Sequence, residues 1–254
     1  MASRWAYEGL AVTQYMANDY ERVFYAFDQR MKTANWKKDL WVRELQERSA
    51  DVRRALGDPA KMDARAYDLS LIRNEIGKEV RSLRGFTFPA IGKLDPAQVD
   101  ATTLDALDAS LNTLTSHYRN AYREAERAKE ERIASMTSTP ASRLLYFDLL
   151  DRHRNESLAD FVTNKNDVNV IVDADGELVQ KSDPIYVEPR EGGFFAAHFY
   201  APVKRVFGQA IPTLWANILL LWGMTVLLAL ALQANLFPKL IQRLSTHPWN
   251  KTQA

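Results

Sequence analysis

An uncharged stretch near the C-terminus constrains this chain more than any other feature. No Asp, Glu, Lys or Arg occurs between Arg205 and Lys239, and residues 211–236 read IPTLWANILLLWGMTVLLALALQANL. A helix that crosses a bilayer needs about 20 mostly apolar residues, because each residue rises ~1.5 Å across a hydrocarbon core of ~30 Å. The stretch therefore predicts a transmembrane helix within residues 206–238, with Pro212 in its first turn and Pro238 at its exit. A buried core helix of a soluble protein is the less favoured interpretation, since such helices are seldom apolar on all sides.

Composition excludes several classes of function. The 33 basic and 32 acidic residues leave no basic surplus of the kind that nucleic-acid-binding proteins usually show, so we expect no nucleic-acid partner. The absence of cysteine excludes disulfides, thiolate zinc sites, iron–sulfur clusters and cysteine nucleophiles. The first ten residues, MASRWAYEGL, lack the order of an export signal. If they begin the protein, the large domain would stay in the cytoplasm, whereas earlier membrane spans in a longer protein could place it outside.

Apolar residues recur every three or four positions through the first 160 residues, and this predicts a mainly α-helical fold. Residues 1–17 predict a short helix, which we interpret either as a helix at the membrane interface or as an ordinary core helix. Longer helices are expected over residues 20–56, 69–83 and 102–134. The last is typical of a coiled coil or an antiparallel helical hairpin, because its apolar residues repeat as Leu104, Leu107, Leu111, Leu114, Tyr118, Tyr122 and Ala125. Charges alternate over residues 119–132, which predicts a solvated helix face or, less favoured, a docking surface.

The pattern changes after residue 160. Val168, Val170 and Val172 recur at every second position ahead of an Asp–Gly turn, and this predicts a β-hairpin over residues 168–181. Aromatic residues then gather before the apolar stretch, and they suit either a belt at the lipid headgroups or a buried cluster: Phe194, Phe195, Phe199, Tyr200 and Phe207. The predicted organisation is thus an interfacial helix (1–17), a helical domain (18–205), a transmembrane helix (206–238) and a short tail (239–254).

The sequence contains no recognisable catalytic motif. It lacks a GxxxxGK[ST] phosphate loop, a GxSxG elbow and an HExxH pair. The four histidines are far apart in sequence, and none has a second metal ligand three or four residues away: His117, His153, His198 and His247. We therefore expect a protein that is not an enzyme, with no catalytic, cofactor-binding or metal-binding residues of its own.

Two residues inside the apolar stretch predict contacts with other helices. Asn217 is its one strongly polar residue before Gln233. Polar side chains within a bilayer usually face neighbouring helices or a transport pathway. Gly223 would let another helix approach closely. Both residues are our candidates for transmembrane packing or a pathway.

Several segments resemble one family of transporters. Residues 3–12, SRWAYEGLAV, resemble the SRWAFEAL-type segment that follows the fifth membrane helix of G-type ABC transporters, most closely a bacterial branch with ABC-2-type permeases and a large extracytoplasmic insertion. Four further segments resemble that branch in the same order: residues 71–76 (LIRNEI), 154–160 (RNESLAD), 180–186 (QKSDPIY) and 198–202 (HFYAP).

The resemblance implies a specific place for this chain. In that family an ATP-binding domain, which binds ATP and magnesium, and five membrane helices come first. Residues 1–254 would then be the last external segment and the sixth membrane helix of a transporter in the bacterial inner membrane. The helical domain would be extracytoplasmic, the tail cytoplasmic and the assembly a homodimer. Because the nucleotide-binding motifs are missing here, any ATP hydrolysis would belong to another part of the protein. The alternative hypothesis is a tail-anchored helical scaffold that recruits a cytoplasmic partner.

Overall fold

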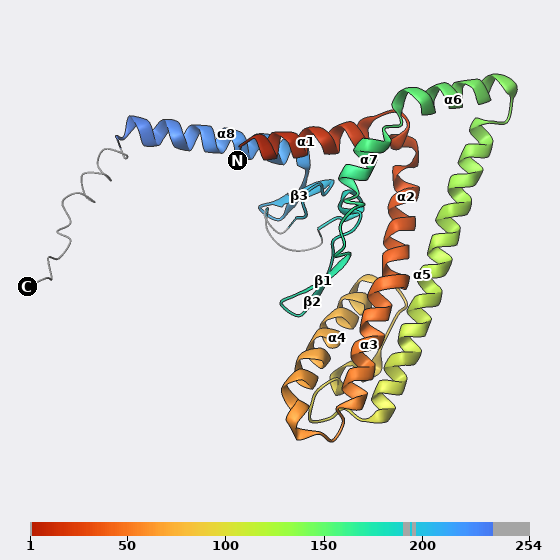
Figure 1. Cartoon of the computed structure of the whole chain (residues 1–254), viewed down its shortest axis with the longest axis vertical. Helices are drawn as coiled ribbons and strands as arrows, with labels where there is room; N and C mark the ends of the chain where they lie inside the picture. Colours follow the sequence, from red (N-terminus) through yellow and green to blue (C-terminus); the bar gives the residue numbers. More distant parts are fainter. Residues whose placement is uncertain (1, 190–193, 195–196, 236–254) are drawn as a thin grey trace, which may run out of the picture.

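The chain folds mainly into α-helices, as the sequence predicts, together with two small β-hairpins (Figure 1). The computed structural model describes residues 2–189, 194 and 197–235. The helices are α1 (Ala2–Ala17), α2 (Glu21–Trp36), α3 (Val42–Arg54), α4 (Met62–Ser82), α5 (Ala101–Met136), α6 (Pro140–His153), α7 (Glu156–Val162) and α8 (Thr213–Gln233). The strands are β1 (Ile171–Ala174), β2 (Glu177–Gln180), β3 (Val203–Val206) and β4 (Gln209–Pro212).

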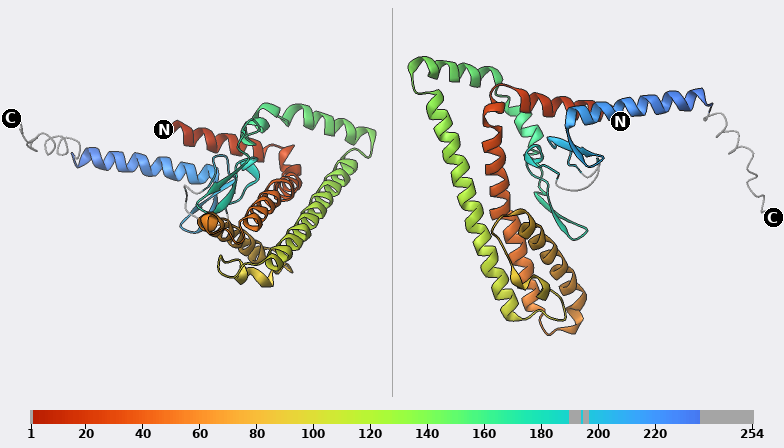
Figure 2. Two further views of the ribbon diagram at one scale, coloured as in Figure 1. Left: turned by 60° about the horizontal axis from the view of Figure 1, so that its bottom comes forward. Right: turned by 180° about the vertical axis from the view of Figure 1, so that it is seen from behind.

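Helices α2 to α5 form an elongated arm that projects from α1 (Figures 1 and 2). A π-helical segment, Lys37–Trp41, joins α2 to α3 in one continuous run, and α5 packs antiparallel along that run. The apolar stripe predicted within residues 102–134 faces the core of the arm, where four of its leucines are fully buried: Leu104, Leu107, Leu111 and Leu114. The predicted antiparallel hairpin is therefore present, whereas the coiled-coil supercoil stays a prediction.

Helix α1 meets the arm at a sharp corner (Figure 1). A second cluster of buried hydrophobic residues, separate from the core of the arm, stabilises this corner. The hydroxyl groups of Tyr15 and Tyr186 lie 2.7 Å apart, and the Tyr25 hydroxyl donates to the carbonyl of Ile185 at 2.7 Å. On the other side of α1, Tyr7 and Leu10 are 50% and 64% exposed. The helix thus has one face in the core and another that is open, while a position of α1 at the membrane interface stays a prediction.

The predicted β-hairpin is confirmed as the β1–β2 pair, although its strands pair over residues 171–180 rather than over 168–181. Asp175 and Gly176 form its turn with φ values of 54° and 80°. Two positive φ values are typical of a type I′ turn, whose twist matches that of the flanking strands. Arg48 of α3 binds the hairpin to the arm, because its guanidinium bonds Asp173 of β1 and Asp68 of α4, each at 2.8 Å. The β3–β4 hairpin was not predicted.

Helix α8 begins at Thr213 rather than at the predicted boundary of 206, because residues 203–212 pair as the second hairpin. Pro212 therefore ends β4 instead of occupying the first helical turn. The Thr213 N–H donates to the Pro202 carbonyl at 3.1 Å, and this bond fixes the start of the helix. The predicted exit at Pro238 and the predicted tail (239–254) lie outside the described residues.

Within the described residues, α8 is the one helix long and apolar enough to cross a membrane. Its most apolar window has a mean hydropathy of 2.0, and 11% of that window is buried. Large side chains such as Trp222 and Leu227 are 69% and 68% exposed. This exposure contradicts the alternative of a buried core helix.

Candidate functional site

A buried polar cluster lies where α1, β3 and the start of α8 meet. Lys204 of β3 donates from Nζ to Oε2 of Glu8 on α1 at 2.7 Å. Asn217 of α8 donates from Nδ2 to the same Oε2 atom and to the Trp5 carbonyl, each at 2.9 Å. We call Glu8, Lys204 and Asn217 the Glu8 cluster. Glu8 is 196 positions from Lys204 and 209 positions from Asn217, so the cluster joins α1 to elements near the other end of the described chain.

The Glu8 cluster is almost completely removed from solvent. Glu8, Lys204 and Asn217 are 0%, 2% and 1% exposed. Burial lowers the pKa of Lys204, and the hydrogen bond to Glu8 acts in the opposite direction. A buried charge is tolerated only when it is paired and hydrogen-bonded, because its lost hydration costs several kcal/mol. The ion pair therefore makes it possible to bury both charges at this junction.

Further contacts complete the surroundings of the two charges. The Tyr200 N–H donates to the second carboxylate oxygen of Glu8 at 3.2 Å. The Lys204 ammonium lies 4.5 Å from the Trp5 ring centroid and 4.8 Å from that of Phe194. A cation over an aromatic face is attracted by the quadrupole of the ring. The cluster is thus enclosed by aromatic side chains and connects α1 to the chain on both sides of β3.

Close packing of α1 on α8 depends on a glycine beside the cluster. A Cβ atom at Gly9 would lie 3.3 Å from Leu214 Cδ1 and 3.4 Å from Leu214 Cα. Small residues allow helix backbones to approach closely, as in many membrane helix pairs. Gly9 therefore sets the short separation at which Asn217 reaches Glu8 and the Trp5 carbonyl.

The two residues predicted for transmembrane packing have different surroundings. Asn217 contacts another helix, but that helix is α1 of the same chain. Its Oδ1 atom is buried and accepts no hydrogen bond from a described residue. A Cβ atom at Gly223 would meet nothing within 4 Å, so the described residues leave this part of α8 uncovered. Packing of another helix at Gly223 stays a prediction.

The arm holds a second buried polar network, at its π-helical segment. The Trp41 indole N–H donates to Glu75 Oε2 at 2.7 Å, and Glu75 Oε1 accepts from Lys78 at 2.7 Å and from the Leu178 N–H at 3.3 Å. Glu79 on the next turn of α4 binds both Lys37 of the π segment and Tyr118 of α5. These bonds join α4, α5, β2 and the π segment, and their positions suit a structural role.

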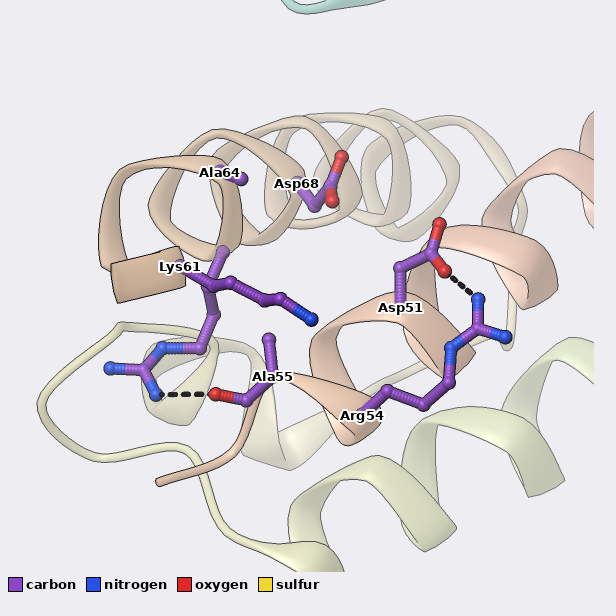
Figure 3. Close-up of a pocket in the computed structure, with 7 residues that line it drawn as sticks. Asp51, Arg54, Ala55, Lys61, Ala64 and Asp68 are labelled. Atoms are coloured by element: carbon purple, nitrogen blue, oxygen red, sulfur yellow. Dashed lines mark hydrogen bonds and ion pairs between the residues drawn. The ribbon is translucent and has the colours of Figure 1, made fainter. Parts of the chain in front are cut away.

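A cavity of about 390 Å³ lies at the far end of the arm, between α3 and α4 (Figure 3). The Lys61 side chain extends into it, and the lining also includes Ala55 and Ala64. Its two carboxylates are already paired: Asp51 with Arg54, and Asp68 with Arg48. Both carboxylates of the lining thus contact arginine side chains.

Neither a metal-binding group of side chains among the described residues nor a match to known proteins indicates a function for this chain. Across residues 2–189, 194 and 197–235, no group of three or more His, Cys, Asp or Glu side chains could hold a metal ion. No protein-family model matches the sequence, and comparisons with curated proteins and with solved structures return no significant match. The Glu8 cluster is the candidate site, because its buried hydrogen bonds hold α1, β3 and the start of α8 together.

Proposed function

We propose that this chain is the non-catalytic C-terminal portion of an ATP-driven membrane transporter of the ABC-2, G-type kind. It would comprise an external domain and the last membrane helix. One observation carries the proposal. Helix α1 is held by the Glu8 cluster against the first turns of α8, while most of the remaining α8 surface is apolar and exposed. A helix of this kind suits a bilayer and the neighbouring helices of a permease.

The direction of α1 supports the same proposal. Trp5 and Glu8 contact Asn217, while the later Gly9 lies against the earlier Leu214, so the two helices run antiparallel. The start of α1 thus points along α8 toward its middle (Figures 1 and 2). In the proposed transporter, a membrane helix ahead of α1 would continue beside α8 in the same layer.

The arm would act outside the membrane in the proposed transporter. It extends away from the α1–α8 pair in all three views (Figures 1 and 2), and its buried networks give it a defined shape. We infer that it caps or gates the external mouth of the permease in a homodimer. ATP and magnesium would bind the nucleotide-binding domain of the same transporter, which would supply the energy.

The reading frame upstream of residue 1 tests this proposal. We expect a continuous frame that encodes a phosphate-loop motif followed by five apolar runs, each long enough to cross a bilayer. A promoter and a ribosome-binding site directly ahead of Met1 would contradict the transporter and favour the tail-anchored scaffold.

One structural feature favours the scaffold alternative. The second half of α5 carries an exposed face of both charge signs, which includes Arg119, Arg123, Glu124, Arg127 and Glu130. Such a face could bind a cytoplasmic partner, although charged helix faces are commonly just solvated. The two hypotheses place the arm on opposite sides of the membrane, so its orientation distinguishes them.

A further inference from the structure

The tip of the β3–β4 hairpin exposes an aromatic ring completely. Phe207 and Gly208 connect Val206 to Gln209, and the Phe207 side chain is 102% exposed. Their φ values are 51° and 81°, so both lie in the left-handed region. The two residues thus form a type I′ turn, in which Asn–Gly is strongly preferred.

Phenylalanine is an unfavourable residue for this position in a water-exposed turn. A bulky side chain at positive φ is strained, and such strain commonly marks functional positions. Exposure of the ring to water brings no compensating burial among the described residues. An aromatic residue kept in this conformation and so far from the core suggests a ligand outside the fold.

The position of the turn identifies that ligand. Strand β4 ends at Pro212 and α8 starts at Thr213, so the tip is about four strand residues, or ~13 Å, from the start of the candidate membrane helix. Trp215, in the first turn of α8, is 60% exposed. Arg205 holds the turn, because its Nη1 donates to the Gly208 carbonyl at 3.1 Å. Exposed aromatic side chains beside the end of a membrane helix are typical of the lipid headgroup region.

We propose that Phe207 is an interfacial anchor, which inserts its ring into the headgroup region of the bilayer beside the start of α8. The proposal rests on the membrane-spanning role of α8 in the proposed function. The Phe207 ring would move from water into the lipid interface. The rigid two-residue turn would hold the ring there at a fixed distance from α8. The hairpin would thereby limit the tilt of α8 and of the attached arm.

Single-cysteine labelling tests the anchor, because the chain has no native cysteine. Three variants, Phe207→Cys, Val168→Cys and Trp222→Cys, are each labelled with an environment-sensitive nitrobenzoxadiazole dye in the full chain, reconstituted into phosphatidylcholine vesicles. Val168 is a matched apolar control, 91% exposed on the loop before β1, and Trp222 reports whether α8 is in the bilayer. We expect the dye at 207 to show a blue-shifted emission and to be quenched by lipids with headgroup nitroxides. The dye at 168 should show neither effect, and the dye at 222 should be quenched by nitroxides on the acyl chains.

Every other outcome of the labelling experiment would contradict the anchor proposal, and the three labelled positions distinguish these outcomes from one another. If the dye at position 222 is quenched but the dye at 207 behaves like the dye at 168, the anchor proposal is wrong and the membrane role of α8 stands. A blue shift at 207 without quenching by lipid would mean that protein covers the ring instead. Loss of quenching at 222 as well would overturn both proposals. Phe207→Asn should leave the midpoint of thermal unfolding unchanged or higher, since Asn favours this turn; a lower midpoint would show that the ring packs within the chain.

Discussion

Lys204 Nζ lies 2.7 Å from Glu8 Oε2, although the two residues are 196 positions apart in the sequence. This ion pair connects the first helix to the strand that precedes α8, and Asn217 extends the connection to α8 itself. One buried carboxylate therefore fixes α1, the β3–β4 hairpin and the start of the candidate membrane helix relative to each other. Since α1 continues at its other end into the arm, the position of the arm also depends on this carboxylate.

Removing the carboxylate should destabilise the fold strongly. Glu8→Ala leaves the Lys204 ammonium buried without a counter-charge, and we expect a loss of about 3–5 kcal/mol in the free energy of unfolding. Chemical denaturation of the chain in detergent micelles measures this loss. Glu47→Ala is the control, because Glu47 pairs with Arg43 at 3.8 Å with both side chains 65% exposed, and its loss should have little effect. Equal effects of the two substitutions would refute a special role for Glu8.

Replacing both charges together should restore most of that stability. In Glu8→Leu/Lys204→Met, no charge remains to be desolvated, and apolar side chains of similar size fill the site. We expect the double variant to be more stable than Glu8→Ala by at least about 2 kcal/mol, measured in the same denaturation experiment. A double variant as unstable as the single one would show that the hydrogen bonds to Asn217 and Tyr200, rather than the charge of Lys204, dominate.

The close approach of α1 and α8 leads to a third prediction. Gly9→Leu places a side chain against Leu214, so we expect it to separate the helices and cost about 1–3 kcal/mol. Gly223→Leu should leave the stability of the isolated chain unchanged, because nothing described lies within 4 Å of its Cβ position. Thermal unfolding in detergent compares the two variants. If Gly223→Leu were the more damaging, α8 would pack in the isolated chain in a way that the structure does not show.

The arm should depend on its own core and not on the exposed apolar residues of α6. Leu111 is fully buried in α5, so Leu111→Ala should cost about 2–5 kcal/mol. Leu144 of α6 is 72% exposed, so Leu144→Ala should change stability by less than about 0.5 kcal/mol. Far-ultraviolet circular dichroism during denaturation measures the stability of both variants. A large loss for Leu144→Ala would mean that another copy of the chain covers α6 in solution.

Glu21 makes the stability depend on pH in a predictable direction. Burial raises the pKa of its carboxyl group above the ordinary value of 4.5, with a further contribution from Asp28, while Tyr15 and Lys129 act in the opposite direction. An acid whose pKa is raised by folding binds protons more tightly in the folded state, so it lowers stability as pH rises above 4.5. Glu21→Gln should therefore raise the midpoint of thermal unfolding at pH 7, and the gain should disappear below about pH 4. A gain that is independent of pH would contradict this cause.

The sequence predicts well those elements whose signal is local. The 26-residue run 211–236 predicts α8, and the leucine spacing predicts α5, because helix periodicity and length can be read within one segment. The β1–β2 hairpin carries an Asp–Gly turn, which is a strong local signal. The β3–β4 hairpin was missed because Phe207–Gly208 lacks that signal and because its second strand merges into the apolar run.

The candidate site was only partly predictable for a different reason. Asn217 was identified because a strongly polar residue in an apolar helix is conspicuous, and Glu8 could have been noticed as the one acidic residue of α1. Pairing Glu8 with Lys204, however, requires the spatial arrangement of three elements. The role of Gly9 likewise depends on where α1 crosses α8, and the sequence of neither helix specifies that crossing.

The side of the membrane on which the arm lies tests the central claim most directly. Val168 lies on the loop before β1, and Arg48 of α3 binds the β1 strand to the arm, so a label at 168 reports the side on which the arm lies. In intact cells that express the complete gene product, Val168→Cys is treated with a membrane-impermeant maleimide, and the chain is then recovered and its labelling quantified. The proposed transporter portion predicts full labelling without lysis, because the arm would be external. Labelling that appears only after the cells are lysed would place the arm in the cytoplasm and contradict the account.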